Sequence, residues 1–532
     1  MHGSYTKRSL FLGLMALLPC LPALSQPAFS IRGANVFSHA IVENTQGHLI
    51  LCGDFTGSAV FGSTNETSFS STRSDAFLAS FNADGTERWV VILGRNGGDL
   101  ANDCDVDPAG NVWVTGNTAE SVDFDPGPGT AQSTGPYLAS YDVNGTFRFL
   151  FSPGSQFTAA SGGLAVDGSG NVYFSGELYD DVDFDTGPGD QTLMADNSGA
   201  YLASFTSAGA YRFAIPIPDA SGFAIPEDVA VDASGNVALM GGFSSDFDFD
   251  PDPGSTEMLN ITGPGIYAAS YTTAGAFRYV TGYAFNGILT AEYGGTFDSD
   301  GNFYLASLFE GTTDFDPGPG VLTRTSAGGD DGIVLKYNST GDIVGVAQFG
   351  GTGDDAATDA GAFADRAIYV AGVFEGTATF GTGVNSQTLT AVGNDDAVAV
   401  AYTTNLELDT VSRIGSSAAD IGLGASASPT GLGLFTGRLA SSSNDFAVAA
   451  KTARVIFAGG FAVGVRANAA LPVELTAFTA LADGHDALAL SWGTATETDN
   501  AGFSVELMRP GTRTFQEVDF VPGAGTTSEP RT

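Results

Sequence analysis

The chain has 532 residues, of which 20 are lysine or arginine and 60 are aspartate or glutamate, so its formal net charge is −40. A surface this negative repels phosphate backbones and anionic lipid, and we therefore expect neither a nucleic-acid partner nor binding to a membrane surface. Intrinsic disorder is also excluded, because hydrophobic residues make up 43% of the sequence and phenylalanine alone occurs 39 times.

The first 25 residues have the pattern of a secretory signal peptide. Lys7 and Arg8 precede an apolar stretch over residues 10–24, and Ala23-Leu24-Ser25 supplies the small residues that a cleavage site requires. The stretch is too short to span a bilayer comfortably, and no later segment is long and apolar enough to do so. We therefore expect a secreted protein, extracellular or on the cell surface, with no membrane insertion after cleavage.

Two cysteines, Cys52 and Cys104, remain after the expected cleavage. Export permits a disulfide between them, although connectivity cannot be deduced from sequence. The alternative is two buried thiols, and the sequence leaves the choice open.

A repeated segment covers most of the remaining chain. VDPAGNVWVTG, VDGSGNVYFSG, VDASGNVALMGG and FDSDGNFYLAS align on the turn glycines Gly110, Gly170, Gly235 and Gly301. Weaker copies align on Gly47, on Asp365 in the place of the glycine, and on Gly431. The seven copies follow one another at a nearly constant step of roughly 60–66 residues, so the repeat is not a chance pattern.

Each copy reads as two β-hairpins, and the second has its own turn glycine, as at Gly145, Gly209, Gly275 and Gly341. Two hairpins make a four-stranded antiparallel sheet, which cannot bury both of its faces alone. We therefore predict an all-β fold in which residues 26–468 form a seven-bladed β-propeller with four-stranded blades. A row of open sheets is the alternative, but it would leave two end faces exposed. We also predict that residues 29–32 complete the last blade and close the ring.

The segments GNFYLASLFEGTTDFDPGPG and GGDDGIVLKYNSTGDIVGVAQFGGTGDD resemble the bacterial β-propeller repeat family often called SBBP. The resemblance covers roughly residues 38–460 and is strongest in the second to fifth copies. It implies a secreted or cell-surface bacterial protein that is typically a non-catalytic module. The first, sixth and seventh copies depart from the pattern, so a ring of ligands would be incomplete there.

A second resemblance covers residues 471–532. Leu-Pro-Val-Glu-Leu at its start, Trp492 and Asn500-Ala-Gly-Phe503 are similar to the fibronectin-type-III-like module that precedes a sorting domain in proteins exported by the type IX system. Alternating residues predict strands near 473–479, 487–493, 502–508 and 514–519. Because a full sandwich of this type needs about 100 residues, we expect a truncated, partial β-sandwich here.

The sharpest local motif is Asp-Phe-Asp-Pro-Gly-Pro-Gly and its variants, which suggests a calcium site. Alternating carboxylates beside a turn can supply the hard oxygen ligands that Ca²⁺ prefers. The candidate ligands are Asp123, Asp125, Asp183, Asp185, Asp248, Asp250, Asp314 and Asp316. The alternative is structural, with the aspartates capping backbone amides in a rigid turn.

The phenylalanine of this motif is predicted to point to the buried face. These residues are Phe124, Phe184, Phe249 and Phe315. The first and sixth copies keep a phenylalanine, Phe61 and Phe380, while they lose the aspartates. This difference favours packing as the requirement that all copies share.

Catalytic constellations are sparse, and we assign no catalytic or cofactor-binding residue. His39 and His48 flank the first hairpin on opposite strands, where a metal or acid/base role would need convergent partners, and no HExxH, GxSxG or phosphate-cradling loop occurs. Acidic pairs such as Asp330-Asp331, Asp354-Asp355 and Asp395-Asp396 are expected to be solvated loops, since a chain this acidic forms them freely. Trp89 and Trp113 fit core packing as well as stacking on a sugar.

These observations favour a monomeric, non-catalytic binding or scaffold module for an extracellular glycan or protein, with calcium as the only expected cofactor. The alternative is a secreted carbohydrate-active hydrolase or lyase that uses carboxylates of the channel. A structural role in a surface layer or in adhesion is a third class. Because propellers host all of these functions, the fold alone does not decide among them.

Overall fold

The computed structural model describes residues 31–32, 35–83, 85–153, 161–178, 180–194, 199–217, 224–244, 248–252, 254–259, 261, 263–285, 293–415 and 417–438, and for the backbone alone 453–456, 460–465, 473–483, 487–508 and 515–527. The expected signal peptide lies outside the described residues. The chain divides into two compact units, of which the larger is Pro27–Ala467 and the smaller contains Asn468–Thr532.

The larger unit begins with four separate four-stranded antiparallel sheets. The first sheet consists of β2 (Val36–Glu43), β3 (Leu49–Phe55), β6 (Asp75–Phe81) and β7 (Glu87–Leu93). The second sheet consists of β8 (Leu100–Val106), β9 (Val112–Asp123), β10 (Gln132–Tyr141) and β11 (Phe147–Phe151). The third sheet consists of β12 (Ser161–Val166), β13 (Val172–Leu178), β16 (Gly199–Phe205) and β17 (Tyr211–Ile217). The fourth sheet consists of β18 (Ala224–Val231), β19 (Val237–Phe243), β20 (Gly265–Tyr271) and β21 (Phe277–Ala284).

An eight-stranded sheet follows and has two halves. Its earlier half consists of β22 (Gly294–Phe297), β23 (Phe303–Phe309), β26 (Asp331–Tyr337) and β27 (Ile343–Gly351). Its later half consists of β28 (Ala356–Phe363), β29 (Ala367–Phe380), β30 (Gln387–Tyr402) and β31 (Leu408–Ile414). The halves are joined because the end of β27 pairs with the end of β29. The last sheet has the order β32 (Ile421–Ala427), β33 (Gly433–Arg438), β35 (Gly460–Val465) and β34 (Ala453–Ile456).

Short elements decorate these sheets. They are β1 (Ile31–Arg32), β4 (Ser58–Phe61) and β5 (Thr64–Thr67) in one small sheet, β14 (Val182–Asp183) with β15 (Thr192–Leu193), and β24 (Thr312–Asp314) with β25 (Thr323–Thr325). The only helical element among the described residues is the 3₁₀ turn η1 (Gly383–Asn385). The all-β prediction is therefore confirmed.

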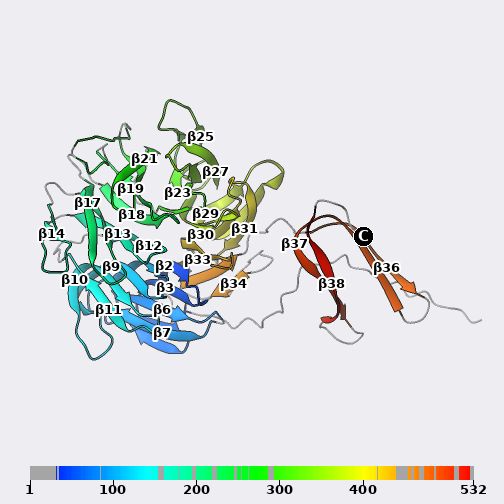
Figure 1. Cartoon of the computed structure of the whole chain (residues 1–532), viewed down its shortest axis with the longest axis horizontal. Helices are drawn as coiled ribbons and strands as arrows, with labels where there is room; N and C mark the ends of the chain where they lie inside the picture. The colour runs from blue at the N-terminus through cyan, green and yellow to red at the C-terminus, as the bar shows by residue number, and fades with distance from the viewer. Residues whose placement is uncertain are drawn as a thin grey trace, which may run out of the picture. The chain divides into compact units, whose positions relative to one another are not determined.

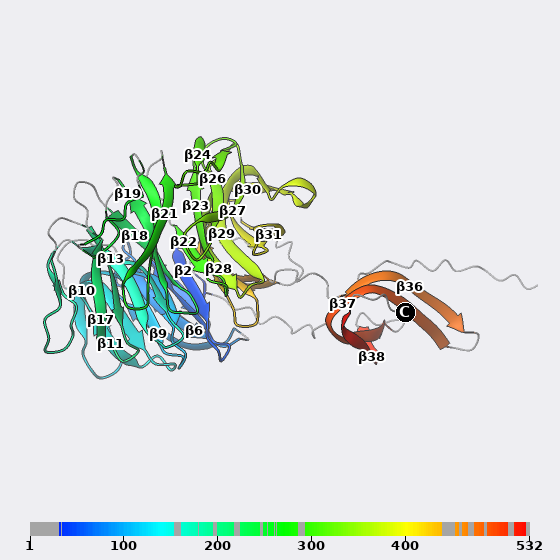
Figure 2. The same cartoon turned by 45° about the horizontal axis from the view of Figure 1, so that its top comes forward.

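The first strands of the sheets lie in the middle of the larger unit and the fourth strands lie at its rim. Figure 1 shows β2, β12 and β18 near the centre, with β7, β11, β17, β21, β27 and β31 around the outside. The circuit of first strands is closed, since β2 contacts β8, β8 contacts β12, and so on through β18, β22, β28 and β32, which returns to β2. Figure 2 shows the same stacked sheets from an inclined direction. The structure thus confirms a propeller-like arrangement of four-stranded sheets.

The prediction that residues 29–32 complete the last sheet is not confirmed by a strand pairing. Among the described residues β1 pairs with β4, where Ile31 lies opposite Phe61, although it also contacts β35 of the last sheet. The same position of a later copy, Phe380 in β29, pairs with Phe349 at the end of β27. β1 therefore takes the position, beside the first sheet, that the end of the preceding sheet's fourth strand takes in the later copy, and Ile31 is buried in the core cluster around Phe61.

The turn glycines of the repeat have the backbone conformation that selects glycine. Gly110, Gly170, Gly235 and Gly301 have φ values of 84°, 81°, 80° and 78°, a region that residues with a Cβ rarely adopt. In the sixth copy Arg366 takes the place of the turn glycine, since its N–H donates to the carbonyl of Phe363, so the sequence alignment on Asp365 is off by one residue; the positive φ, 49°, falls on Ala364.

Adjacent sheets bury the faces that one sheet alone would expose. All residues of β3, β19 and β23 are buried, and one core cluster combines side chains of the first and second sheets, among them Cys52 and Val114. Trp113 is completely buried in another cluster, between the second and third sheets, which agrees with the packing role considered for it. Stacking therefore provides the hydrophobic stabilisation that a single sheet lacks.

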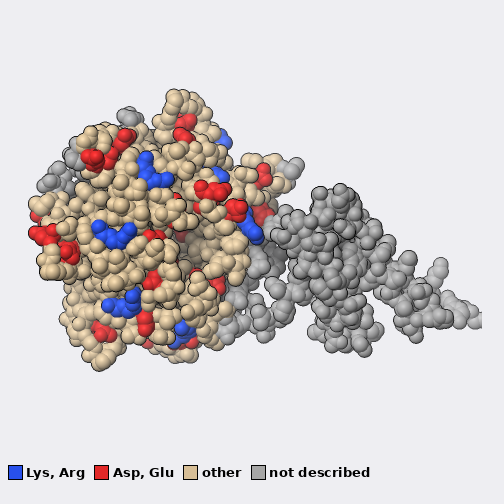
Figure 3. Space-filling model, viewed as in Figure 1, with Lys and Arg blue, Asp and Glu red and all other residues tan. Residues whose placement is uncertain are grey.

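Basic side chains clamp each of the early sheets to the next one. Arg212 donates to Ser204 Oγ (2.6 Å) of its own sheet and to the carbonyl of Thr273 (2.7 Å) in the fourth sheet, and its guanidinium carbon lies 5.2 Å from the ring centre of Tyr173. Equivalent clamps are formed by Arg88, Arg148, Arg278 and, from another strand position, Lys336. Figure 3 shows the basic side chains of one face as separate small patches among acidic ones.

Replacing Arg212 with methionine is expected to lower the free energy of unfolding by about 1–2 kcal/mol, because the charge-assisted bonds and the contact with Tyr173 are lost together. Urea unfolding would measure this change. Arg324→Met is the matched control, since the one hydrogen bond of the Arg324 side chain within the described part of the chain is to the carbonyl of its neighbour Thr323. An equal loss in both variants would contradict the clamp.

The smaller unit contains one three-stranded sheet, formed by β36 (Val473–Asp483), β37 (Ala487–Met508) and β38 (Phe515–Thr527). The strands expected near 487–493 and 502–508 are both part of β37, so the prediction of four separate strands is wrong. The residues between them are also extended, although residues 497–500 are all polar and do not continue the alternation. The partial sandwich and the fibronectin-type-III resemblance remain predictions.

Candidate functional site

The closed circuit of first strands carries a set of aspartates that tie neighbouring sheets together. We call Asp103, Asp228 and Asp359 the wall aspartates. In each of them Oδ1 accepts the N–H of the next residue, and Oδ2 accepts an N–H from the first strand of the following sheet or half-sheet. Asp103 Oδ2 lies 2.8 Å from Leu164 N, Asp228 Oδ2 3.0 Å from Gly295 N, and Asp359 Oδ2 2.7 Å from Ala425 N.

Glycine alternates with the wall aspartates around the circuit. In each copy the wall position precedes the first turn by the same distance. Gly163 and Gly294 occupy it between two aspartates, Gly424 follows Asp359, and the first copy has Ala40. A Cβ on Gly163 would lie 2.7 Å from Asp228 Cα, and one on Gly294 would lie 2.9 Å from Asp359 Cα. Where neighbouring first strands approach this closely, one sheet has an aspartate at the wall position and the next sheet has a glycine, which has no side chain.

Burial raises the pKa of two of the wall carboxyls, Asp103 and Asp228. The pKa of Asp103 is raised well above its usual value by burial and by the negative charge of Asp228, and that of Asp228 by burial and by Asp359. Asp105, two residues further along β8, is held in the same way by Val106 N and Val166 N, and burial raises its pKa to about 6. These carboxyls resist ionisation more than exposed aspartates, yet their oxygens accept bonds from backbone amides.

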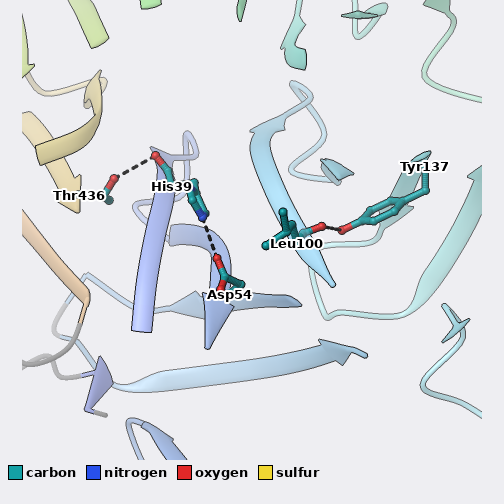
Figure 4. Close-up of polar contacts among 5 residues, drawn as sticks. All are labelled: His39, Asp54, Leu100, Tyr137 and Thr436. Atoms are coloured by element: carbon teal, nitrogen blue, oxygen red, sulfur yellow. Dashed lines mark hydrogen bonds and ion pairs between the residues drawn. The ribbon is translucent and has the colours of Figure 1, made fainter. Parts of the chain in front are cut away.

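A histidine–aspartate pair lies at the seam where the last sheet meets the first sheet. His39 Nε2 lies 2.9 Å from Asp54 Oδ1, and the carbonyl of His39 accepts a hydrogen bond from Thr436 Oγ1 of the last sheet at 3.2 Å (Figure 4). Ser426 Oγ, also of the last sheet, donates to the carbonyl of Ile41 at 2.6 Å. The side chains of His39 and Asp54 remain 20% and 11% exposed, so the pair is accessible from the seam.

The sequence analysis missed Asp54 as the partner of His39. Asp54 lies 15 residues away on the neighbouring strand, opposite Phe37, and the register is shifted by a bulge between Ser38 and Ala40. That bulge places His39 and Phe37 with their rings stacked, at a centroid distance of 6.4 Å. Pairing the two strands from the turn at Gly47 would have brought these residues close, but the bulge itself has no clear sequence signal. Figure 4 also shows the hydrogen bond that the Tyr137 hydroxyl donates to the carbonyl of Leu100, which links β10 to β8 within the neighbouring second sheet.

The predicted calcium ligands cap their own turns. Asp123 Oδ1 accepts the amides of Asp125 and Ala131, and Asp125 Oδ1 accepts that of Gly127. The same Oδ1 bonds occur at Asp183, Asp185, Asp248, Asp250, Asp314 and Asp316. Among the described residues no group of three or more acidic, histidine or cysteine side chains is arranged to hold a metal ion. The phenylalanines between the aspartates are buried, as predicted.

The acidic pairs are not the solvated loops that the composition suggested. In each pair the second member, Asp331, Asp355 or Asp396, is at most 1% exposed. Asp355 accepts the amides of Gly351 and Glu375, and burial raises its pKa to about 6. These residues are inside because amides of the same and adjacent strands satisfy them, which composition cannot indicate.

Cys52 and Cys104 are both buried and free, which decides the open question in favour of two thiols. They belong to one core cluster of the first and second sheets. Burial, together with a side-chain hydrogen bond to Cys52, raises the pKa of Cys104 well above its usual value. A thiol of this kind is packed and unreactive.

The architecture and the wall place the larger unit in the broad class of β-propeller-like proteins. No family model matches the chain, and no curated protein matches it. Among solved structures it is similar to a protein of unknown function from Dyadobacter fermentans, at 11% identity over 70% of this chain and 97% of that chain, with a TM-score of 0.36.

Two further matches come from bacterial enzymes. A catalytically inactive virginiamycin B lyase from Staphylococcus aureus with quinupristin is 11% identical over 77% of this chain and 94% of that chain, with a TM-score of 0.37. A gluconolactonase from Xanthomonas campestris is 12% identical over 65% and 95%, with a TM-score of 0.27. Similarity this low carries no conclusion about activity, and the resemblance to the SBBP family remains a prediction. No helix in the described part of the chain is long and apolar enough to cross a membrane.

Proposed function

We propose that the larger unit is a seven-bladed β-propeller that acts as a secreted or cell-surface binding module without catalytic activity. The blade count follows from dividing the eight-stranded sheet into its two halves, each with the same strand order as the separate sheets. The number of sheets and half-sheets then equals the number of sequence copies. The closed circuit of first strands supports one ring.

The observation that carries the non-catalytic part of the proposal is the bonding of the wall aspartates. Both oxygens of Asp103, Asp228 and Asp359 accept backbone amides, and one of the two bonds crosses to the next sheet. A general acid, base or nucleophile needs an oxygen that can reach a substrate. The wall aspartates, whose carboxylates a hydrolase in the channel would need for catalysis, therefore have a structural role.

A carbohydrate-active enzyme is the second candidate, and one observation favours it. His39 is bonded to Asp54 in an accessible position at the seam, and an aspartate that orients a histidine is a common arrangement of a general base. The two candidates differ in whether bound glycan is cleaved, and this difference can be measured directly.

The proposed ligand of the binding module is an extracellular glycan. The test is to incubate the purified full chain with immobilised extracellular polysaccharides and to measure both retention and released sugars. Retention without products supports the proposal. Released products that disappear in His39→Gln would replace it with the enzyme, and absence of retention on every polysaccharide would leave no basis for glycan binding.

Calcium is proposed as a stabilising ion of the Asp-Phe-Asp-Pro-Gly-Pro-Gly turns. The amide bonds use Oδ1 in each case, so an ion would be held by Oδ2 atoms and neighbouring carbonyls. Millimolar calcium is then expected to raise the unfolding temperature relative to EDTA, because an ion that binds only the folded state stabilises it. The gain should shrink in Asp314→Asn/Asp316→Asn. Identical melting curves with calcium and with EDTA would mean that these turns bind no stabilising calcium ion and that their aspartates only cap backbone amides.

A further inference from the structure

The seam between the last and the first sheet carries a second group of accessible side chains beside the His39–Asp54 pair. Arg438, the last residue of β33, places its guanidinium carbon 4.8 Å from the ring centre of Phe37. The ring of Phe37 is stacked with that of His39 at an angle of 11°. All three side chains are only partly buried. The seam therefore places a partly buried cation next to two stacked aromatic rings.

Arg438 differs from the other arginines that lie over rings. Arg148, Arg212 and Arg278 each donate to a serine hydroxyl and to a carbonyl of the next sheet. Arg438 Nε, by contrast, is buried and has no hydrogen-bond partner within the described part of the chain. A guanidinium has several N–H donors in a fixed planar arrangement that matches the oxygens of a carboxylate or sulfate, and buried donors in proteins normally have an acceptor.

The position of Arg438 also varies among the copies of the repeat. Counted from the turn glycine, it corresponds to Asp54, Asn117 and Glu177 in the first three copies, whereas the fourth and fifth copies have Gly242 and Leu308. The wall positions on the facing strands instead keep their pattern of aspartate and small residues. Polar residues thus gather on one arc of the ring, formed by the last sheet and the first three sheets, where packing does not dictate them.

We propose that the seam binds an anionic sugar, with Arg438 as the group that holds its carboxylate or sulfate. The flat step of Phe37 and His39 offers an apolar surface for the sugar ring, and the His39–Asp54 pair lies beside it for a ring hydroxyl. A peptide carboxylate would satisfy Arg438 but would make no use of that pair. The inference rests on the proposed glycan-binding function and names the class of ligand.

Calorimetric titration of the full chain with digalacturonate, galactose 6-sulfate and galactose tests the proposal. We expect both anionic sugars to bind at least about tenfold more tightly than galactose, because each gains charge-assisted hydrogen bonds to the guanidinium. Arg438→Met should remove this preference, and Arg438→Lys should restore only part of it, since an ammonium lacks the fork. Arg324→Met is the control and should leave the preference unchanged.

Three results would overturn the proposal. These are equal binding of charged and neutral sugars, an unchanged preference in Arg438→Met, and binding of a peptide with a free carboxyl terminus while no sugar binds. Circular dichroism of each variant separates loss of binding from loss of fold. If polysaccharides are retained equally by the wild type and by Arg438→Met, the binding module survives and only the seam is refuted. If the wild type retains none, the proposed function itself fails.

Discussion

Replacing Gly163 with alanine is expected to destabilise the protein by about 1–3 kcal/mol, the usual cost of an overpacked interior. The added Cβ would lie 2.7 Å from Asp228 Cα and 2.8 Å from Val229 N. Both atoms belong to the backbone of β18, so no rotation of a side chain can relieve the clash. The first strands of the third and fourth sheets would have to separate, and this movement would weaken the circuit that carries the wall.

Gly168→Ala is the matched control for Gly163→Ala. Gly168 lies five residues further along the same copy, at an exposed turn, and a Cβ there would meet nothing within 4 Å. The equivalent position of the fourth copy is already alanine, Ala233. We expect a change within about 0.5 kcal/mol for the control in urea unfolding. If the two variants lost the same stability, the close approach of the strands would not be what limits this position.

The turns and the buried aromatic residues could be predicted because their cause is local. A glycine such as Gly110 or Gly235 is selected by the positive φ of its own turn, and the copies align on it. Phe249 was assigned to the interior because phenylalanine persists in copies that lose the neighbouring aspartates, and it is 1% exposed. One residue and its sequence neighbours decide these features.

The wall could not be predicted in the same way, because each of its bonds joins two copies. Asp103 and Leu164 are 61 residues apart, and their contact depends on how one sheet stacks on the next. The alternation of aspartate with Gly163 and Gly294 is visible in the aligned copies, but only the close approach of the strands explains it. Asp331 was misjudged for a related reason, since its burial depends on bonds to Ala327 and Gln348 rather than on composition.

The wall also predicts that the protein loses stability as the pH rises through the mildly acidic range. Burial raises the pKa of Asp105 from its ordinary value of 3.8 to about 6 in the folded protein. A carboxyl whose pKa is raised by folding contributes fully below the unfolded pKa, and the contribution is lost as the pH rises through the folded pKa. Wild type should therefore lose stability relative to Asp105→Asn, which cannot ionise, between about pH 4 and pH 7.

Over this pH range the free energy of unfolding of the wild type is expected to fall by about 1–3 kcal/mol relative to that of Asp105→Asn. One pKa unit is worth about 1.4 kcal/mol, and part of Asp105 still touches solvent. Asp142→Asn should behave in the opposite sense. Burial alone would raise the pKa of Asp142, but hydrogen bonds from the amides of Thr146 and Asn144 hold that pKa below its usual value. The Asp142 carboxylate therefore stabilises the fold above about pH 4, and this stabilisation is lost in acid. Chemical unfolding of the three proteins at several pH values would reveal the two opposite slopes. If the free energies of unfolding of the wild type and of Asp105→Asn changed in parallel with pH, Asp105 would be as easily ionised in the folded protein as in the unfolded chain. Its surroundings on β8 would then be solvated rather than enclosed.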